Sequence, residues 1–145
     1  MIFLKHYKIK MVIKSININE YQDYINLSKK EGLMFCGNTK LFGLFIDNKI
    51  VGFTGVLFVK NKVIFKNHFV LHEYRGMGYF KYLLEFSIKL IQNMGYKTIE
   101  ANCTPMSIKE YIKRGFDVVK IYRNGIKKVR KRYENNKTGH KYKQC

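Results

Sequence analysis

Residues 67–80 read NHFVLHEYRGMGYF, a strand-like run that leads through a glycine-containing turn directly into a helical pattern. Glycines at positions 76 and 78 permit the backbone to approach a ligand closely. The free N–H groups and the positive dipole end of a helix that begins there form a site for phosphate. The segment fits neither the P-loop pattern nor the G-x-G-x-x-G dinucleotide pattern. By itself it is equally consistent with an ordinary strand-to-helix turn.

The flanking sequence predicts an alternation of strands and helices. Before the turn, we expect a strand at Met11–Ile16, a helix from an N-cap at Asn19 to Gly32, and a meander of three strands, Leu41–Ile46, Ile50–Val59 and Val63–Leu71. After it, we expect a helix at Gly78–Met94 ended by Gly95, a strand at Thr98–Cys103, a helix from Thr104-Pro105 to Arg114, and strands at Phe116–Tyr122 and Ile126–Arg132.

This order of elements predicts an α/β fold, of the α+β mixed-sheet kind, in a single domain. A chain of 145 residues has room for one hydrophobic core. We expect the domain to occupy residues 1–133. Residues 134–145 are polar, rich in lysine and without hydrophobic period, so they are expected to form a flexible basic tail.

Composition narrows the classes of partner and the compartment. The formal net charge of +18 attracts phosphate-bearing partners, namely nucleic acid, an anionic membrane or a nucleotide cofactor, although a solvated lysine-rich surface has the same charge. No stretch approaches the roughly 20 apolar residues of a membrane span. The three cysteines, Cys36, Cys103 and Cys145, are scattered and suggest neither a disulfide framework nor a metal site. We therefore expect a cytoplasmic protein with reduced thiols and no membrane association.

Two motifs resemble those of the GNAT superfamily of acyl-CoA-dependent N-acetyltransferases. Arg75-Gly76-Met77-Gly78-Tyr79-Phe80 is similar to the Q/R-x-x-G-x-G/A loop that binds the CoA pyrophosphate, with Phe80 in place of the usual small residue. Tyr111-Ile112-Lys113-Arg114-Gly115-Phe116 resembles the Y-x-x-x-G-F ending of the next helix. The resemblance covers residues 41–120. It implies a GNAT-like fold, in which helices flank a mostly antiparallel sheet whose central strands splay apart to admit the cofactor.

The resemblance also implies roles for residues of the site. Acetyl-CoA would be the co-substrate, bound by residues 75–80. Tyr111 aligns with the tyrosine that protonates the departing CoA thiolate, a step that suits a phenol with a pKa of about 10. A backbone N–H near Val70 or Leu71 would stabilise the oxyanion of the tetrahedral intermediate. Thr104 stands where the family has an asparagine that contacts pantetheine, so that contact is not implied here.

The base that takes the proton of the attacking amine is not defined by a motif. His68 interrupts an apolar strand near the place where the splayed strand should face the acceptor, and an ordinary histidine pKa of about 6.5 suits the task. His72 is a second candidate if the pairing is regular, whereas a β-bulge would change its side. Cys103 has no adjacent histidine, which favours direct transfer in a ternary complex over a covalent acyl-enzyme.

The sequence thus predicts an N-acetyltransferase whose amine acceptor is of unknown class. A polyamine-like molecule, a protein amine and a nucleic-acid amine all remain open, and so does the oligomeric state. The basic segment 127–132 would hold phosphates if the acceptor were linked to nucleic acid. The alternative is a non-catalytic basic module that binds nucleic acid on the same fold.

Overall fold

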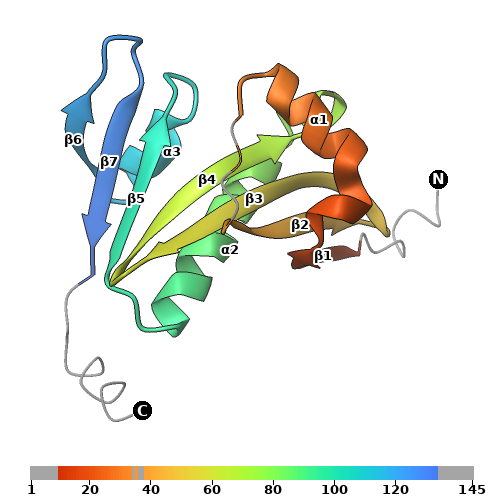
Figure 1. The fold of residues 1–145 in the computed structure, drawn as a ribbon, viewed down its shortest axis with the longest axis horizontal. Coiled ribbons are helices and arrows are strands. Elements are labelled where there is room, and N and C mark those ends of the chain that lie inside the picture. The colour runs from red at the N-terminus through yellow and green to blue at the C-terminus, as the bar shows by residue number, and fades with distance from the viewer. Residues whose placement is uncertain (1–9, 34, 36–37, 134–145) are drawn as a thin grey trace, which may run out of the picture.

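The computed structural model describes residues 10–33, 35 and 38–133, which form one seven-stranded sheet with three α-helices (Figure 1). The strands are β1 (Met11–Ile16), β2 (Lys40–Ile46), β3 (Lys49–Val59), β4 (Lys62–Val70), β5 (Thr98–Cys103), β6 (Asp117–Ile121) and β7 (Lys127–Arg132). The α-helices are α1 (Gln22–Lys30), α2 (Tyr79–Asn93) and α3 (Ile108–Lys113), with 3-10 turns η2 (Ile18–Tyr21) and η3 (His72–Tyr74).

The sheet has the order β1-β2-β3-β4-β5-β7-β6 and is antiparallel except between β4 and β5. The predicted meander of β2, β3 and β4 is confirmed. Asp47 and Asn48, which join β2 to β3, both have positive φ (49° and 70°), as a tight hairpin turn of the primed type requires. The predicted mixed sheet is therefore present.

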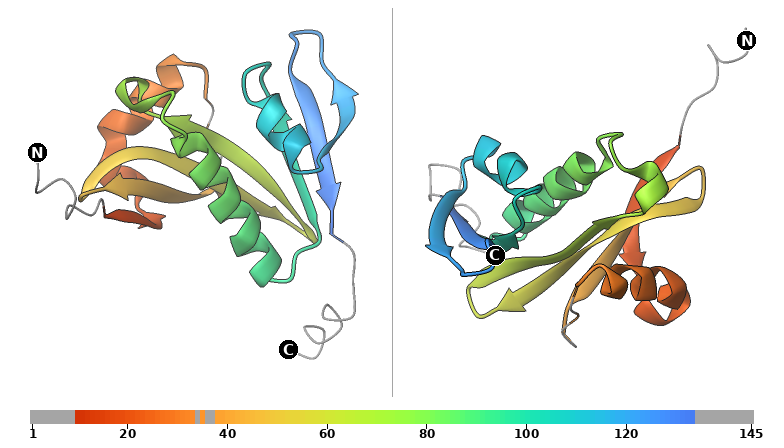
Figure 2. Two further views of the ribbon diagram at one scale, coloured as in Figure 1. Left: turned by 180° about the vertical axis from the view of Figure 1, so that it is seen from behind. Right: turned by 90° about the horizontal axis from the view of Figure 1, so that it is seen from above.

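The helices lie on opposite faces of the sheet and cover different parts of it (Figure 2). Ile25 of α1 packs against Phe53, Phe69 and their neighbours on one face. Leu84 and Ile91 of α2 pack on the other face, in a cluster that also contains Tyr111 of α3. Figures 1 and 2 show that α1 covers the β2–β4 part, while the same face of β5, β7 and β6 has no helix over it.

The two central strands splay apart. β4 and β5 pair only between residues 62–65 and 98–101. Beyond these residues the strands diverge, and Figure 1 shows the ribbons opening into a V toward the end of β4 that leads to α2. The splay that the family resemblance implies is thus present, and it leaves one edge of β4 without a strand beside it.

A β-bulge in β4 changes which residues face which layer. Lys66 pairs with Gly55 and Phe69 with Phe53, so Asn67 and His68 of β4 lie opposite Thr54 alone. Phe65 faces α2, but after the bulge it is Val70, not Phe69, that does so. One extra residue shifts the alternation of a strand by one position. His68 consequently turns toward the α2 and α3 side.

Several expected boundaries need correction. Asn19 is not the N-cap of α1, which is Tyr21. Asn19 lies inside the preceding 3-10 turn η2, whose N-cap Asn17 accepts the Asn19 N–H with its side-chain oxygen at 2.9 Å. The helix expected from Thr104-Pro105 begins at Ile108, because residues 104–107 form a turn in which the Thr104 carbonyl accepts the Ser107 and Ile108 N–H groups. The predicted tail at 134–145 lies outside the described residues.

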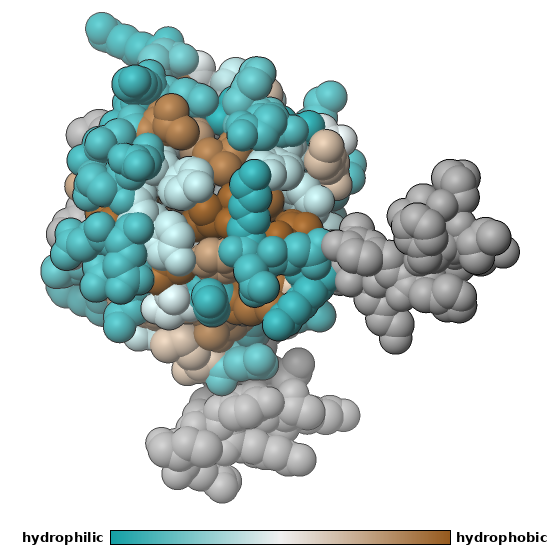
Figure 3. Space-filling view, turned by 90° about the vertical axis from the view of Figure 1, so that its right-hand side faces the viewer, coloured by the Kyte–Doolittle hydropathy of each residue, from teal (hydrophilic) through white to brown (hydrophobic). Residues whose placement is uncertain are grey.

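The surface on the β1 side is mostly hydrophilic around a central hydrophobic area (Figure 3). β1 is an edge strand, and its Lys14 lies over the Phe45 ring with Nζ 4.7 Å from the centroid. A charged residue on an edge strand opposes pairing with another sheet. No helix within the described part of the chain is long and apolar enough to cross a membrane.

Candidate active site

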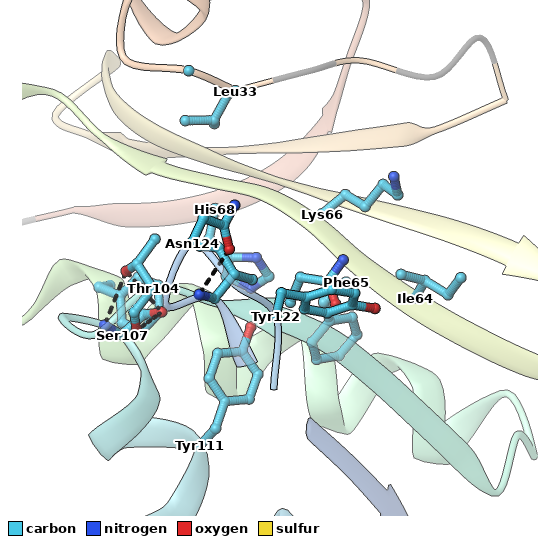
Figure 4. A pocket seen from close by; sticks show the side chains of 14 residues that line it. Leu33, Ile64, Phe65, Lys66, His68, Thr104, Ser107, Tyr111, Tyr122 and Asn124 are labelled. Carbon is cyan, nitrogen blue, oxygen red and sulfur yellow. Dashed lines mark hydrogen bonds between the residues drawn. The ribbon is translucent and has the colours of Figure 1, made fainter. Parts of the chain in front are cut away.

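A cavity of about 580 Å³ lies where β4 and β5 diverge, and we call it the splay pocket. On the side of α2 and α3 it is lined by Phe65, His68, Phe80, Ser107 and Tyr111. On the opposite face it is lined by Ile64, Lys66 and Asn102, with Leu33 and the β6–β7 connection beside them. Both sets line the same cavity, so the splay pocket passes through the sheet (Figure 4).

The loop before α2 has the backbone form expected of a phosphate site. Gly76 and Gly78 adopt left-handed φ angles of 82° and 85°, which favour glycine. A side chain built on either would meet no atom within 4 Å, so the space in front of the loop is open. Gly78 is the N-cap of α2, and the first helical turn carries no acidic residue. The first N–H groups of a helix have no intrahelical acceptor and suit an anion there.

Arg75 does not direct its side chain at this loop. Its Nε donates to the Val70 carbonyl oxygen (2.8 Å), and its guanidinium pairs with Glu31 beyond the end of α1 (2.7 Å). The guanidinium carbon also lies 5.3 Å from the centroid of the Phe69 ring. Arg75 therefore ties the end of β4 to the end of α1, and as placed it supports the loop rather than contacting phosphate.

The two expected backbone donors differ in availability. The Leu71 N–H already donates to the Val51 carbonyl oxygen of β3 at 2.9 Å. Successive N–H groups of a strand point to opposite sides, so the Val70 N–H points toward the side where β5 has diverged. Of the two N–H groups, that of Val70 is therefore the one not used in pairing with β3.

Tyr111 projects from α3 with its hydroxyl directed into the splay pocket toward His68 (Figure 4). Its side chain packs edge-on against Phe116, the last residue of the second motif, with ring centroids 5.1 Å apart. Burial raises the pKa of Tyr111 well above 10. The phenol is therefore protonated throughout the physiological range.

His68 occupies an aromatic enclosure. Its ring centroid lies 5.5 Å from that of Phe65, 5.6 Å from that of Phe80 and 6.4 Å from that of Tyr111. The Thr54 hydroxyl oxygen lies 2.9 Å from Nε2 and 3.0 Å from Nδ1, so it can hydrogen-bond with either nitrogen. Burial lowers the pKa of His68 from 6.5 to about 3, against a hydrogen bond with the Lys66 backbone that raises it. The ring is neutral at pH 7.

The other predicted candidates have different positions. His72 lies in η3, beyond the end of β4, and does not line the splay pocket. Cys103 is buried, and burial raises the pKa of its thiol to about 12, so it is not a poised nucleophile. The Phe80 ring packs into the core beside His68, which accommodates a large side chain where the loop motif usually has a small one.

Sequence reasoning missed several polar residues of the splay pocket. Thr104 and Ser107, whose hydroxyl oxygens are 3.3 Å apart, lie near Tyr111 at one side. Asn102 and Asn124 lie toward the opposite face. No motif marks these residues. Thr104 alone gave a signal, as the replacement for the asparagine of the family. Among the described residues, no Asp or Glu lines the pocket.

Comparison with protein families identifies the chain. The model of the acetyltransferase (GNAT) domain matches residues 10–134. The chain therefore belongs to the GNAT acetyltransferases, which are acyl-CoA-dependent N-acyltransferase enzymes. A search of curated proteins finds no significant match.

Solved structures share the fold at low sequence identity. The ribosomal-protein-S18-alanine N-acetyltransferase from Escherichia coli aligns with a TM-score of 0.71 and 14% identity, over 88% of this chain and 97% of that one. The PaiA N-acetyltransferase from Thermoplasma acidophilum, in complex with coenzyme A, gives 0.69 and 16% over 86% and 99%. A GNAT family acetyltransferase from Elizabethkingia anophelis with acetyl-CoA bound gives 0.64 and 15% over 84% and 97%. These similarities show a GNAT-like fold.

Proposed function

We propose that this chain transfers the acetyl group of acetyl-CoA to an amine by direct attack in a ternary complex. The observation that supports this best is the splay pocket, because a single cavity joins the α2 and α3 side of the sheet to the opposite face. Acetyl-CoA would enter from the helical side and the amine from the other. The proposed domain boundary at residue 133 stays a prediction.

The cofactor would be held mainly by backbone groups. Its pyrophosphate would lie against the N–H groups of residues 76–80, where the left-handed glycines leave open space. The pantetheine arm would then run between β4 and β5, past the hydroxyls of Thr104 and Ser107, which can supply the polar contact that the missing asparagine would have made.

In the reaction, the amine lone pair attacks the thioester carbonyl carbon and the carbonyl π electrons move to oxygen. The Val70 N–H would donate to the oxyanion so formed. Collapse of the intermediate re-forms the carbonyl and expels the CoA thiolate, which takes the proton of the Tyr111 hydroxyl. The products are an acetylated amine and CoA with a free thiol.

The burial of Tyr111 is compatible with this role although it raises the phenol pKa. The same desolvation raises the pKa of the neighbouring Cys103 thiol to about 12. A CoA thiolate expelled into this environment would likewise be a stronger base than in water, because both anions lose their hydration. The pKa values of the phenol and of the CoA thiol would then stay close to each other, so the proton can still pass from the phenol to the thiolate.

His68 would act after the attack. With a pKa of about 3 it is too weak a base to deprotonate a free ammonium ion. Once the nitrogen is bonded to the acyl carbon, its N–H is far more acidic, and a neutral imidazole can accept it. Return of that proton to the Tyr111 phenolate, through solvent across the 6.4 Å between ring centroids, completes the proton balance.

Calorimetric titration of acetyl-CoA into the wild-type protein, Gly78→Asp and Gly95→Asp tests the proposal. Both glycines have left-handed φ (85° and 90°) and open space, so both substitutions introduce the same strain and charge. Gly95 lies just past the opposite end of α2. We expect wild-type binding that Gly78→Asp weakens by about tenfold or more, equivalent to about 1.4 kcal/mol, and that Gly95→Asp retains.

Failure of the folded wild-type protein to bind acetyl-CoA would refute the proposed co-substrate and favour the alternative of a non-catalytic module. Equal losses in both aspartate variants would show that backbone strain, and not the loop, controls binding. Circular dichroism of each variant establishes that it is folded.

A further inference from the structure

The face of β5, β7 and β6 that no helix covers, together with the adjoining residues 62–66 of β4, is strongly basic. Alternation along the strands and the pairing registers place six cations on it, and we call this surface the basic face: Lys62, Lys66, Lys120, Lys128, Arg130 and Arg132. The same alternation places the acidic side chains Glu100 and Asp117 there. This concentration of positive charge comes from β7, whose residues 127–132 read KKVRKR. Alternate residues of a strand lie on one face, so Lys128, Arg130 and Arg132 all lie on the basic face.

Glu100 contacts three of these cations at the centre of the basic face, so its single negative charge leaves a net positive charge there. Its buried carboxylate accepts hydrogen bonds from Lys62 (3.1 Å) and Arg130 (2.7 Å), and Lys128 Nζ lies 3.6 Å away. The three cationic side chains stay about a third exposed (30–34%), while Glu100 is 2% exposed. One hidden carboxylate therefore holds three solvent-facing cations in fixed positions.

The basic face connects two recesses. A second cavity of about 520 Å³ lies at the narrow end of the V, lined by Lys62, Lys97, Arg130, Arg132 and Tyr133 among others. The splay pocket opens at the wide end, beside Lys66 and Tyr122. Alternate residues on one face of a strand are about 7 Å apart, so Lys62 and Lys66 mark a path of about 13 Å from one recess to the other.

An aromatic ring stands at the splay-pocket end of this path. Tyr122 lines the splay pocket and has Lys120 Nζ 4.9 Å from its ring centroid. Tyr133 lines the second cavity, but its ring packs against the core on the α2 and α3 side, with Lys131 Nζ 5.0 Å from the ring centroid. A row of spaced cations that ends at an aromatic ring matches single-stranded nucleic acid, whose phosphates bind cations and whose bases stack on aromatic rings. An acidic peptide or a membrane surface would make no use of the ring.

We propose that the basic face binds the phosphate backbone of a nucleic acid and presents an amine carried by that nucleic acid to the splay pocket. The second half of this statement rests on the proposed acetyl transfer. The chemistry of the pocket agrees with such an acceptor, because no acidic side chain among its described residues would attract a polycationic amine. Phosphate contacts on the face would supply the binding energy that the pocket lacks for a small cation.

Fluorescence anisotropy of a labelled single-stranded RNA of about 12 nucleotides, at several salt concentrations, tests the surface. The face variant is Lys120→Gln/Lys128→Gln/Arg132→Gln, which leaves Lys62 and Arg130 in place to satisfy Glu100. The matched control is Lys49→Gln/Lys89→Gln/Lys109→Gln, which removes the same net charge from exposed positions away from the face. Arg132→Gln alone, at an exposed position, is a second variant in case the triple variant does not fold.

We expect the face variant to lower RNA affinity by about ten- to a hundredfold near 0.1 M salt and to reduce the salt slope by about 2, at about 0.7 per lost phosphate contact. The control should change affinity by less than about threefold. Equal losses in both variants would show diffuse charge attraction and overturn the proposal. Equally tight binding of polyglutamate, lost in the face variant, would show a surface for acidic proteins and overturn it too.

Acetyl-CoA titrations of the same proteins separate this inference from the proposed function. The face variant should bind acetyl-CoA as the wild-type protein does. Wild-type protein that binds acetyl-CoA but no RNA would overturn the nucleic-acid inference alone. RNA binding at the basic face without any acetyl-CoA binding would support the basic face as a nucleic-acid site. It would refute the proposal that the bound nucleic acid presents an amine for acetyl transfer.

Discussion

Replacement of Glu100 by glutamine would remove the charge that holds Lys62, Lys128 and Arg130 together. Breaking a buried ion pair by removing one partner costs about 3–5 kcal/mol when the other charge stays buried. Here the remaining cations are about a third exposed, so solvent can screen them, and glutamine still accepts one hydrogen bond. We therefore expect a loss of about 2–3 kcal/mol at pH 7, or about 5–10 °C in Tm for a domain of this size.

The pH dependence identifies the charge as the cause. Burial alone would raise the pKa of Glu100, but hydrogen bonds from Arg130 and Lys62 and the charge of Lys128 outweigh it and lower the pKa below 4.5. A carboxyl with a depressed folded-state pKa contributes stability above its unfolded-state pKa, and that stability is lost as the pH falls through the folded-state pKa. The difference between wild type and Glu100→Gln should thus be constant near pH 7 and shrink below about pH 4.5.

Urea unfolding followed by circular dichroism at pH 7 and at pH 3 measures this difference. Glu85→Gln is the control, since Glu85 also pairs with an arginine at 2.7 Å but is 58% exposed. Exposed pairs contribute about 0–1 kcal/mol, so this variant should be nearly neutral. A Glu100→Gln variant as stable as wild type at pH 7, or a difference that persists unchanged to pH 3, would refute the assignment of Glu100 as an ionised clamp.

Three further predictions concern Tyr111 of the splay pocket and two buried positions, Gly52 and Cys103. Tyr111→Phe should lower kcat by about a hundredfold or more while leaving the Kd of acetyl-CoA within about twofold, as measured by thiol release and calorimetry; an unchanged kcat would exclude Tyr111 as proton donor. Gly52→Ala should cost about 1–3 kcal/mol in urea unfolding, because a Cβ there would lie 2.6 Å from the Phe69 carbonyl oxygen; wild-type stability would contradict this packing. Cys103, in a variant with serine at the other two cysteines, should resist a thiol reagent at pH 8 until urea unfolds the protein, since its pKa is about 12; rapid labelling of the folded state would contradict its burial.

The fold was largely predictable because local signals agreed with one another. Gly76 and Gly78 sit where the backbone needs left-handed φ, and Gly95 follows the end of α2 as expected. The strand runs of the meander are rich in branched and aromatic residues that favour strands over helices. The loop and Tyr111 were found by motif, and the structure brings Phe80 of the loop and Tyr111 to the same cavity.

Features that depend on distant contacts were not predictable. The bulge at Asn67 and His68 arises from pairing with β3, and the sequence of β4 alone reads as one uninterrupted run. The low pKa of His68 comes from side chains of β4, α2 and α3 that enclose it together. The alternation in residues 127–132 predicts that one side of β7 is charged. The sequence does not predict that this side lacks a covering helix in the described part of the chain, because that depends on where the helices pack.

The passage of the splay pocket through the sheet has a kinetic consequence. In the proposed acetyl transfer, acetyl-CoA and the amine would reach the splay pocket from opposite faces of the sheet. Neither reactant would then block the route of the other, and CoA could depart while the acetylated product is still bound on the other face. We therefore expect no fixed order of addition. Initial-rate plots with acetyl-CoA and amine as the varied substrates should give intersecting lines, and each product should inhibit most strongly against the substrate that binds on the same face.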